Sequence, residues 1–286
     1  MMARMRVHLV SLVSDCTLAA ITLAAITLTA APVRATALGR EVGAGQVRLL
    51  STTLVGLWAY DDDGQRADAD PLRAQSFSTD LELGVAPRLT LRAKLPWVIS
   101  STADASGVQQ RSGIGDVTIG GQLRLTETGP VALSARLDVK APFYSGPPTV
   151  RGRSPSGGPA LGDGQVDVTA LALLGGRLPF SGFVDLELGY RLRAGDVTDA
   201  VVGGGRLGVR ALERRLLLAL RLDTVVTFDP AAGSAERLGR GGATLGPWVA
   251  LRVVDALHLE MGAYYVGRGR NAPGGAELTF GLWLPF

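Results

Sequence analysis

The sequence predicts an all-β chain: a transmembrane, up-and-down antiparallel β-barrel of about 12 strands that follows a cleaved signal peptide. Three observations predict this fold. Charged and apolar residues alternate with a period of two, short turns alternate with long polar loops, and the last strand ends on an aromatic residue. Because hydrocarbon penalises every exposed ion, a chain that crosses a bilayer as strands must keep its charges on the inward-facing parity.

Residues 1–37 have the pattern of a secretory signal peptide. Two arginines open the segment, an apolar stretch covers 18–31, and Ala35-Thr36-Ala37 forms a small-x-small cleavage site. The apolar stretch is too short for a membrane-spanning helix. We therefore expect cleavage before Leu38 and assign residues 38–286 to the barrel domain.

The composition excludes several classes of protein. Of the 29 basic and 26 acidic residues, the leader holds three arginines and one aspartate, so the mature chain carries 26 and 25 and is nearly neutral. The formal charge of +3 is therefore no sign of a nucleic-acid partner. Cys16, the sole cysteine, lies in the leader, so the mature chain forms no disulfide. A mean hydropathy of +0.23, with no apolar run of about eighteen residues after the leader, fits an apolar surface spread over many strands.

Period-two segments bounded by Gly, Pro, Asp and Ser define the strands. They are expected at 47–60, 74–86, 88–99, 114–126, 131–144, 165–175, 182–193, 200–211, 215–228, 243–254, 256–267 and 276–286. The connections alternate between short turns and longer polar loops, and the longer ones are 61–73, 100–113, 145–164, 194–199, 229–242 and 268–275. Outer-membrane barrels carry their short turns on the periplasmic rim, so this alternation predicts the cell outer membrane, with both termini on the periplasmic side. A soluble β-sandwich or propeller is the alternative; a sandwich gives no reason for this alternation, and no propeller repeat is present.

The parity of the charges is the stronger test of a membrane barrel. In 182–193 the charged residues share the odd parity, whereas Leu186, Leu188 and Leu192 lie on the even parity. Across the predicted strands no charged residue falls on the apolar parity. An Arg or Lys that faced lipid at the bilayer midplane would cost about 2–4 kcal/mol, so a barrel requires this exclusion.

Aromatic residues gather at one end of the strands. The strands that lead into the long loops end in Trp58 and Tyr60, Trp97, Phe143 and Tyr144, Tyr190, Phe228, and Tyr264 and Tyr265. This placement predicts an aromatic girdle at the membrane interface. The last strand places Phe280, Leu282, Leu284 and Phe286 on one parity. Such an ending resembles the assembly signal that the bacterial barrel-assembly machinery accepts.

The inward parity predicts a charged lumen. The candidate permeation path is lined by Asp80, Glu82, Arg92, Lys94, Asp116, Arg124, Arg136, Asp138, Lys140, Asp185, Glu187, Arg191, Arg206, Arg210, Arg221, Asp223, Arg252, His258 and Glu260. In a closed tube of low dielectric these groups must pair or be hydrated. Only about nine residues precede the first strand, too few for a folded plug domain. If a plug exists, the loop 145–164 is the expected one.

No residue pattern predicts catalysis. His258 is the only histidine after the leader, and it lies on the inward parity beside Glu260 with no recognisable serine partner. It is therefore expected to be a lumen residue rather than a catalytic base. No metal-ligand spacing is present, and we expect neither an enzyme nor a bound metal or cofactor.

The segment Ser112 to Gly120, with Gly113, Gly115 and Asp116, resembles a recurring element of a family of outer-membrane β-barrels named after the meta-pathway of phenol degradation. In that family a Gly-x-Gly-Asp enters a strand after a long loop. Two further features match: Lys94-Leu95-Pro96-Trp97, and Val139-Lys140-Ala141-Pro142 followed by a long loop that closes on Leu161 to Asp167. The resemblance implies a barrel grouped with transporters. The glycines themselves are expected to form turns at the rim rather than to contact a ligand.

Two functions remain open from the residues. The first is an outer-membrane channel or transporter for passive passage of small solutes, which the resemblance implies to be hydrophobic or aromatic. The second is a non-conducting structural or surface-interaction barrel with a lumen filled by side chains. The expected partners are outer-membrane lipid and lipopolysaccharide, the barrel-assembly machinery and a small-molecule solute.

Overall fold

The structure is a computed structural model that describes residues 36–61, 63–67, 72–104, 107–144, 161–162, 164–194, 198–228, 241–270 and 272–286. The leader prediction for residues 1–35, and most of the loop 145–164, lie outside the described residues. Within the described ranges, no helix combines the length and the apolar character needed to cross a membrane.

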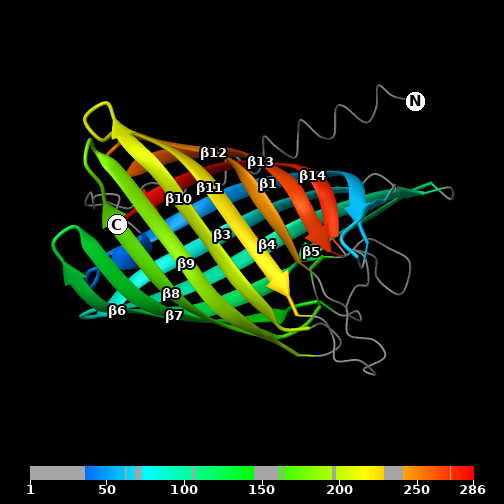
Figure 1. Ribbon diagram of the computed structural model, residues 1–286, viewed down its shortest axis with the longest axis horizontal. Helices are drawn as coiled ribbons and strands as arrows, with labels where there is room; N and C mark the ends of the chain where they lie inside the picture. The colour runs from blue at the N-terminus through cyan, green and yellow to red at the C-terminus, as the bar shows by residue number, and fades with distance from the viewer. Residues whose placement is uncertain are drawn as a thin grey trace.

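A single antiparallel sheet closes on itself to form a barrel (Figure 1). Its strands are β1 (Gly45–Tyr60), β2 (Arg66–Ala67), β3 (Leu72–Ala86), β4 (Leu89–Asp104), β5 (Gly107–Ile114), β6 (Asp116–Thr128), β7 (Val131–Pro142), β8 (Asp167–Arg177), β9 (Gly182–Arg193), β10 (Ala200–Ala211), β11 (Leu216–Thr227), β12 (Gly241–Val254), β13 (Leu257–Arg270) and β14 (Ala272–Pro285). Neighbours in the chain pair with one another, and β14 pairs with β1 from Pro285 opposite Gln46 to Ala272 opposite Tyr60. Closure through β14 and β1 removes the two free edges that an open sheet would have.

The barrel wall has twelve strands, which confirms the fold prediction. β5 and β6 form one wall strand that breaks at Gly115: β5 pairs with the upper half of β4 and β6 with the lower half. β2 lies outside this count, since it pairs only with the end of β1. The predicted bounds of two loops, 100–113 and 268–275, are wrong because strands continue through most of both segments. In the first segment β4 and β5 pair as an extended hairpin, whereas in the second β13 continues along β12 and β14 along β1. The first segment is rich in Ser, Thr and Gln and the second in Gly and Arg, so neither shows the apolar alternation on which the prediction relied.

The two rims of the barrel differ as the sequence predicts. The connections after β3, β6, β8, β10 and β12 span two to four residues at one end, which lies on the left in Figure 1. We call this end the short-turn end; both the start of β1 and the end of β14 lie there, where Gly45 and Phe286 exchange two backbone hydrogen bonds. Short turns mark the periplasmic rim of outer-membrane barrels.

The outer surface of the wall is apolar. On β9, Leu188 is 63% exposed and Leu192 54%, whereas Asp185, on the opposite parity of the same strand, is 7% exposed. The same contrast holds on the last strand, where Leu278 and Phe280 face outward and Trp283 is buried. A closed antiparallel barrel with an apolar exterior is the architecture of outer-membrane proteins, because it satisfies every backbone group without water. The chain is therefore an outer-membrane β-barrel.

The aromatic girdle is only partly as predicted. Trp97, Phe143, Tyr190, Phe228 and Tyr265 are 41–65% exposed and stand on the outer surface, as an interfacial girdle requires. The prediction is wrong for three others: Trp58, Tyr60 and Tyr264 are each at most 9% exposed and face the interior. Tyr144 is half-buried, and its hydroxyl donates a hydrogen bond to Asp116. Tyr264 and Tyr265 are consecutive, so the pleat must send one of the two inward.

The segment before β1 enters the lumen at the short-turn end. This N-terminal strap, residues 37–44, begins within the single turn of 3₁₀ helix η2 (Thr36–Leu38). Ala37, the last residue of the predicted leader, packs against Ala132 and Leu173 in the uncleaved chain, and its carbonyl accepts a hydrogen bond from the Ser134 hydroxyl. Cleavage before Leu38 stays a prediction. Further along, the strap crosses β3, and Gly43 and Ala44 bond to the backbone of Gly84.

The strap is too short to be a folded domain, as expected, but it still occupies part of the lumen, where its backbone bonds to that of Gly84 at the end of β3. Of the loop 145–164, only Leu161, Gly162 and Gly164 belong to the described residues.

Candidate functional site in the barrel lumen

The lumen contains a hollow of about 350 Å³ at mid-height, lined by charged side chains of the inward parity. We call it the central hollow. Its lining comes from ten wall strands together with Gly39 and Arg40 of the strap. Its basic and acidic lining residues occur in near-equal number, which is what an ionised interior of low dielectric requires.

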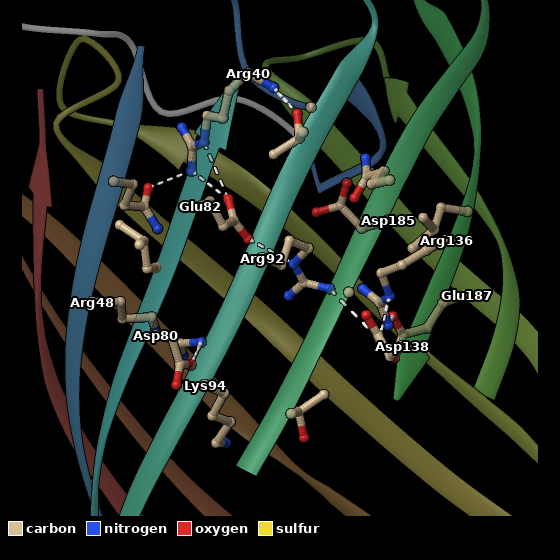
Figure 2. Close-up of a pocket in the computed structure, with 18 of the residues that line it drawn as sticks. Arg40, Arg48, Asp80, Glu82, Arg92, Lys94, Arg136, Asp138, Asp185 and Glu187 are labelled. Carbon is tan, nitrogen blue, oxygen red and sulfur yellow. Dashed lines mark hydrogen bonds and ion pairs between the residues drawn. The ribbon is translucent and has the colours of Figure 1, made fainter. Parts of the chain in front are cut away.

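One side of the central hollow carries a continuous chain of ion pairs, shown in Figure 2. Arg40 of the strap binds Glu82 of β3 at 2.9 Å, and the other oxygen of Glu82 lies 3.3 Å from Arg92 of β4. Arg92 reaches Asp138 of β7 at 3.9 Å. Arg136 then links Asp138 at 3.0 Å to Glu187 of β9 at 2.9 Å. The chain joins the strap to four wall strands, so the charges hold one another in place.

A glycine makes the link between Arg92 and Asp138 possible. Gly120 of β6 lies directly between them in the strand register. A Cβ atom at Gly120 would lie 2.0 Å from the Asp138 carboxylate and 2.6 Å from the Leu137 carbonyl oxygen. Real Cβ atoms do not come so close to an oxygen, so the bare backbone at this position lets the Asp138 side chain cross the strand.

The opposite side of the hollow carries separate pairs. Arg48 of β1 makes a two-pronged contact with Glu260 of β13, whose carboxylate also accepts a hydrogen bond from Trp248 Nε1 at 3.0 Å. On β10 and β11, Arg206 binds Asp185 at 3.0 Å and Arg221 binds Asp223 at 2.7 Å; both acids line the hollow. Lys94 makes no ion pair within the described part of the chain and points along the lumen below Asp80 in Figure 2.

An apolar layer lies below the central hollow. Phe183, Leu217, Trp248, Ala250 and Trp283 pack together on one side, with the two indole rings stacked at 5.7 Å between centroids. Ala37, Ala132 and Leu173 pack together on the other side, with Leu38 against them. We call these two groups the apolar partition. Arg206 and Arg48 lie 5.0 and 5.9 Å from the centroids of Trp248 and Trp283, so cations of the central hollow cover its upper face.

A second hollow of about 770 Å³ lies below the partition, inside the short-turn rim. We call it the basal hollow. Its lining comes from the turns after β6, β8, β10 and β12, with Leu38 of the strap and His258 of β13. The apolar partition separates the two hollows, which share no lining residue. Leu173 and Trp283 line the central hollow. Residues that contact them, Ala132, Leu217 and His258, line the basal hollow.

The structure distributes the predicted lumen residues among three places. The central hollow is lined by Asp80, Glu82, Arg92, Lys94, Arg136, Asp138, Asp185, Glu187, Arg206, Arg221 and Asp223. The basal hollow is lined by Arg210, Arg252 and His258. Asp116, Arg124, Lys140, Arg191 and Glu260 line neither hollow, and each bonds to a neighbour in the wall or the adjacent rim: Asp116 to Lys140, Arg124 to Glu127, Arg191 to Thr169 and Glu260 to Arg48. Their part in permeation stays a prediction.

Sequence reasoning missed two arginines of the central hollow. Arg48 is the lone charge of β1, whose inward parity also carries Leu50, Leu54 and Trp58, so that strand shows no clean alternation. Arg40 precedes the first strand and has no periodic pattern to place it. Arg48 could have been assigned to the lumen from the sequence, because it lies on the opposite parity to Val47 and Leu49.

The glycines of the family-like motif have a role that differs from the predicted one. Neither Gly113 nor Gly115 has a positive φ, so they are not turn-formers. Instead they face Leu161: a Cβ at Gly115 would lie 2.9 Å from the Leu161 carbonyl oxygen, and one at Gly113 would lie 3.0 Å from its side chain. Asp116 beside them binds Lys140 at 3.3 Å and accepts a hydrogen bond from Tyr144 at 3.0 Å. The motif thus seats the end of the long loop against the wall.

Metal chemistry has no support in the described ranges, where no three His, Cys, Asp or Glu side chains are grouped so that they could hold an ion. His258 is 3% exposed, and neither of its ring nitrogens has a hydrogen-bond partner. Its ring contacts Trp283 at 6.0 Å between centroids.

Comparisons with solved structures show the same architecture. An outer-membrane channel from Pseudomonas putida F1 superposes with a TM-score of 0.68 at 19% identity, over 90% of this chain and 100% of that one. The translocator domain of the autotransporter NalP from Neisseria meningitidis gives 0.50 at 11% identity, over 87% and 91%. The β domain of the Bordetella autotransporter BrkA gives 0.50 at 17% identity, over 86% and 100%. No family model matches the sequence, and no curated protein is significantly similar to it. At these identities the likeness concerns the fold.

Proposed function

We propose that this protein is a passive outer-membrane channel for small solutes. The observation that carries the proposal is the central hollow, a charged space of about 350 Å³ enclosed by a membrane-spanning barrel. Ionised groups inside a low-dielectric wall must be hydrated or paired with one another. A lumen lined by such groups offers solutes a polar route through the hydrocarbon. The superposition with the outer-membrane channel from Pseudomonas putida F1 agrees with this proposal.

The resemblance in the Gly113–Asp116 segment supports a finer proposal on the solutes. It favours membership of the barrel family named after the meta-pathway of phenol degradation, and so hydrophobic or aromatic solutes. Trp283, whose ring stacks on Trp248, lines the charged hollow and supplies one aromatic contact there for a flat apolar solute.

A planar lipid bilayer measurement tests the channel directly. The purified protein should insert and give discrete conductance steps, and a double substitution Arg92→Gln and Arg136→Gln should change their size or ion selectivity, because it alters the charge of the central hollow. Arg88→Gln, in the exposed turn between β3 and β4, is the matched control and should leave the steps unchanged. An inserted, folded protein that leaves the bilayer tight at every voltage would refute the proposal.

The second candidate is a non-conducting barrel with a filled lumen, and the apolar partition is the observation that favours it. The partition lies between the two hollows, with the strap as one of its parts. Weakening it separates the candidates: Leu217→Ala in a channel should raise the conductance, whereas in a structural barrel it should only lower stability.

A further inference from the structure

The basal hollow has a charge imbalance that the central hollow lacks. Four arginines line it, Arg177, Arg210, Arg214 and Arg252, against two glutamates. Of these glutamates, Glu127 already binds Arg124 at 2.9 Å. Glu213 is therefore the one remaining acidic group in the described lining, and the hollow carries an excess of positive charge.

Of the four arginines, Arg252 pairs with Asp255 of the turn after β12 at 3.6 Å, which leaves three arginines against Glu213. Arg177 and Arg214 make no ion pair within the described part of the chain, and they come from the turn regions after β8 and β10. Arg210 is fixed, because it donates a hydrogen bond to the Gly182 carbonyl at 3.3 Å and its guanidinium lies 5.0 Å from the Phe183 ring centroid. Guanidinium groups bind carboxylates and phosphates through parallel hydrogen bonds.

A buried polar side chain faces the same space without a partner. His258 lines the basal hollow and is only 3% exposed, yet neither Nδ1 nor Nε2 makes a hydrogen bond. Buried polar groups in proteins nearly always have a partner, so an unpartnered ring nitrogen at the wall of a hollow indicates a missing one. A ligand oxygen would supply it.

The floor of the hollow is apolar. Leu38 of the strap, Ala132 of β7 and Leu217 of β11 line it, and the last two belong to the partition and are at most 8% exposed. A bare inorganic anion would leave this floor uncovered, whereas an anion with an apolar body would cover it.

We propose that the basal hollow is a binding site for a small organic anion, with its oxyanion group on Arg177, Arg210 and Arg214 and its apolar body against Leu38, Ala132 and Leu217. Treating this anion as a transported solute rests on the proposed channel function. Binding of the anion in the basal hollow does not depend on transport. At the periplasmic rim such a site would hold a solute that has passed the partition, since a positive vestibule concentrates anions.

Fluorine NMR on the purified full-length barrel in a neutral detergent tests the site. The probe is 4-fluorobenzoate, with the uncharged 4-fluorobenzyl alcohol as its matched control and inorganic phosphate as a competitor. The benzoate should bind saturably and at least about tenfold more tightly than the alcohol, because a charged hydrogen bond contributes about 1.5–3 kcal/mol. Equal affinity for both probes overturns the anion assignment, and phosphate binding as tightly as benzoate overturns the apolar floor.

Substitutions in the lining test whether 4-fluorobenzoate binds in the basal hollow. Arg210→Gln with Arg214→Gln should weaken benzoate binding at least about tenfold. Arg215→Gln, in the same turn but outside the lining, should leave it unchanged. Glu213→Gln keeps the arginines and should tighten binding, so an unchanged or weaker affinity there overturns the site even if the double variant folds poorly. If the protein conducts ions but does not bind benzoate, the anion site is refuted and the channel proposal stands. If it binds benzoate but does not conduct, only the channel proposal is refuted.

Discussion

Arg48 and Glu260 are 212 positions apart in the sequence and form a two-pronged ion pair across the seam where the barrel closes. Arg48 lies on β1 and Glu260 on β13, with β14 between them. The pair passes over Gly281 of β14, where a Cβ atom would lie 2.6 Å from Glu260 Oε1. The first strand and the last two strands are thus joined by side chains as well as by backbone hydrogen bonds.

Removing one partner of this pair should destabilise the barrel. Glu260 is 1% exposed, so Arg48→Met leaves a buried carboxylate with only the Trp248 N–H as a partner. We expect a loss of about 3–5 kcal/mol in the free energy of unfolding, measured by urea titration in detergent. The double variant Arg48→Met with Glu260→Gln should recover most of the loss, because no unpaired charge remains. Glu127→Gln breaks the exposed pair with Arg124 and should cost less than about 1 kcal/mol.

Gly120 should tolerate no side chain. Gly120→Ala brings a Cβ against the Asp138 carboxylate and should break the link between Asp138 and Arg92. We expect a lower urea midpoint and, for a channel, a changed conductance. The neighbouring Gly121→Ala is the control, because the nearest atoms to its Cβ lie 4.0 Å away. Equal effects of the two substitutions would contradict the assigned role of Gly120.

The N-terminal strap should limit conduction. Arg40 anchors it, with hydrogen bonds to Glu82 and Gln46 and a backbone N–H donated to Thr90 Oγ1 at 2.8 Å. Arg40→Ala should loosen the strap and raise the single-channel conductance measured in planar bilayers. Arg88→Ala, an equal loss of charge in an exposed turn, should leave it unchanged. A conductance that does not respond to Arg40→Ala would mean that the strap does not obstruct the path.

The outer surface should reject charge in a depth-dependent way. Leu188 lies mid-strand on β9 and Leu192 one residue from its end at the long-loop rim. Leu188→Arg should cost about 2–4 kcal/mol and Leu192→Arg about 0–1 kcal/mol, as read from the folded fraction after refolding into lipid vesicles. Leu188→Ala separates the charge from the loss of volume. Equal costs at both positions would argue against a bilayer-facing wall.

The architecture of this protein was predictable because its main determinant acts on one residue at a time. A charged side chain such as Asp185 or Arg206 must avoid hydrocarbon whatever its neighbours are, so the parity of each strand could be assigned from local sequence. The turn lengths then distinguished the two rims of the barrel, and together with the parity they predicted twelve strands. The strand extensions at 100–113 and 268–275 escaped prediction because neither the Ser- and Thr-rich segment nor the Gly- and Arg-rich one shows an apolar alternation.

The lumen could not be derived in the same way, since it depends on which strands come together and how closely. Nothing local pairs Arg48 with Glu260, places Arg40 on Glu82, or leaves Gly115 open for Leu161; these contacts arise only when the sheet closes and the backbones approach. The sequence by itself determined that this chain is a barrel with its ions inside. The tertiary structure alone decided where those ions meet, where the apolar partition lies and where positive charge remains unbalanced, because ion pairing is a property of distances in space.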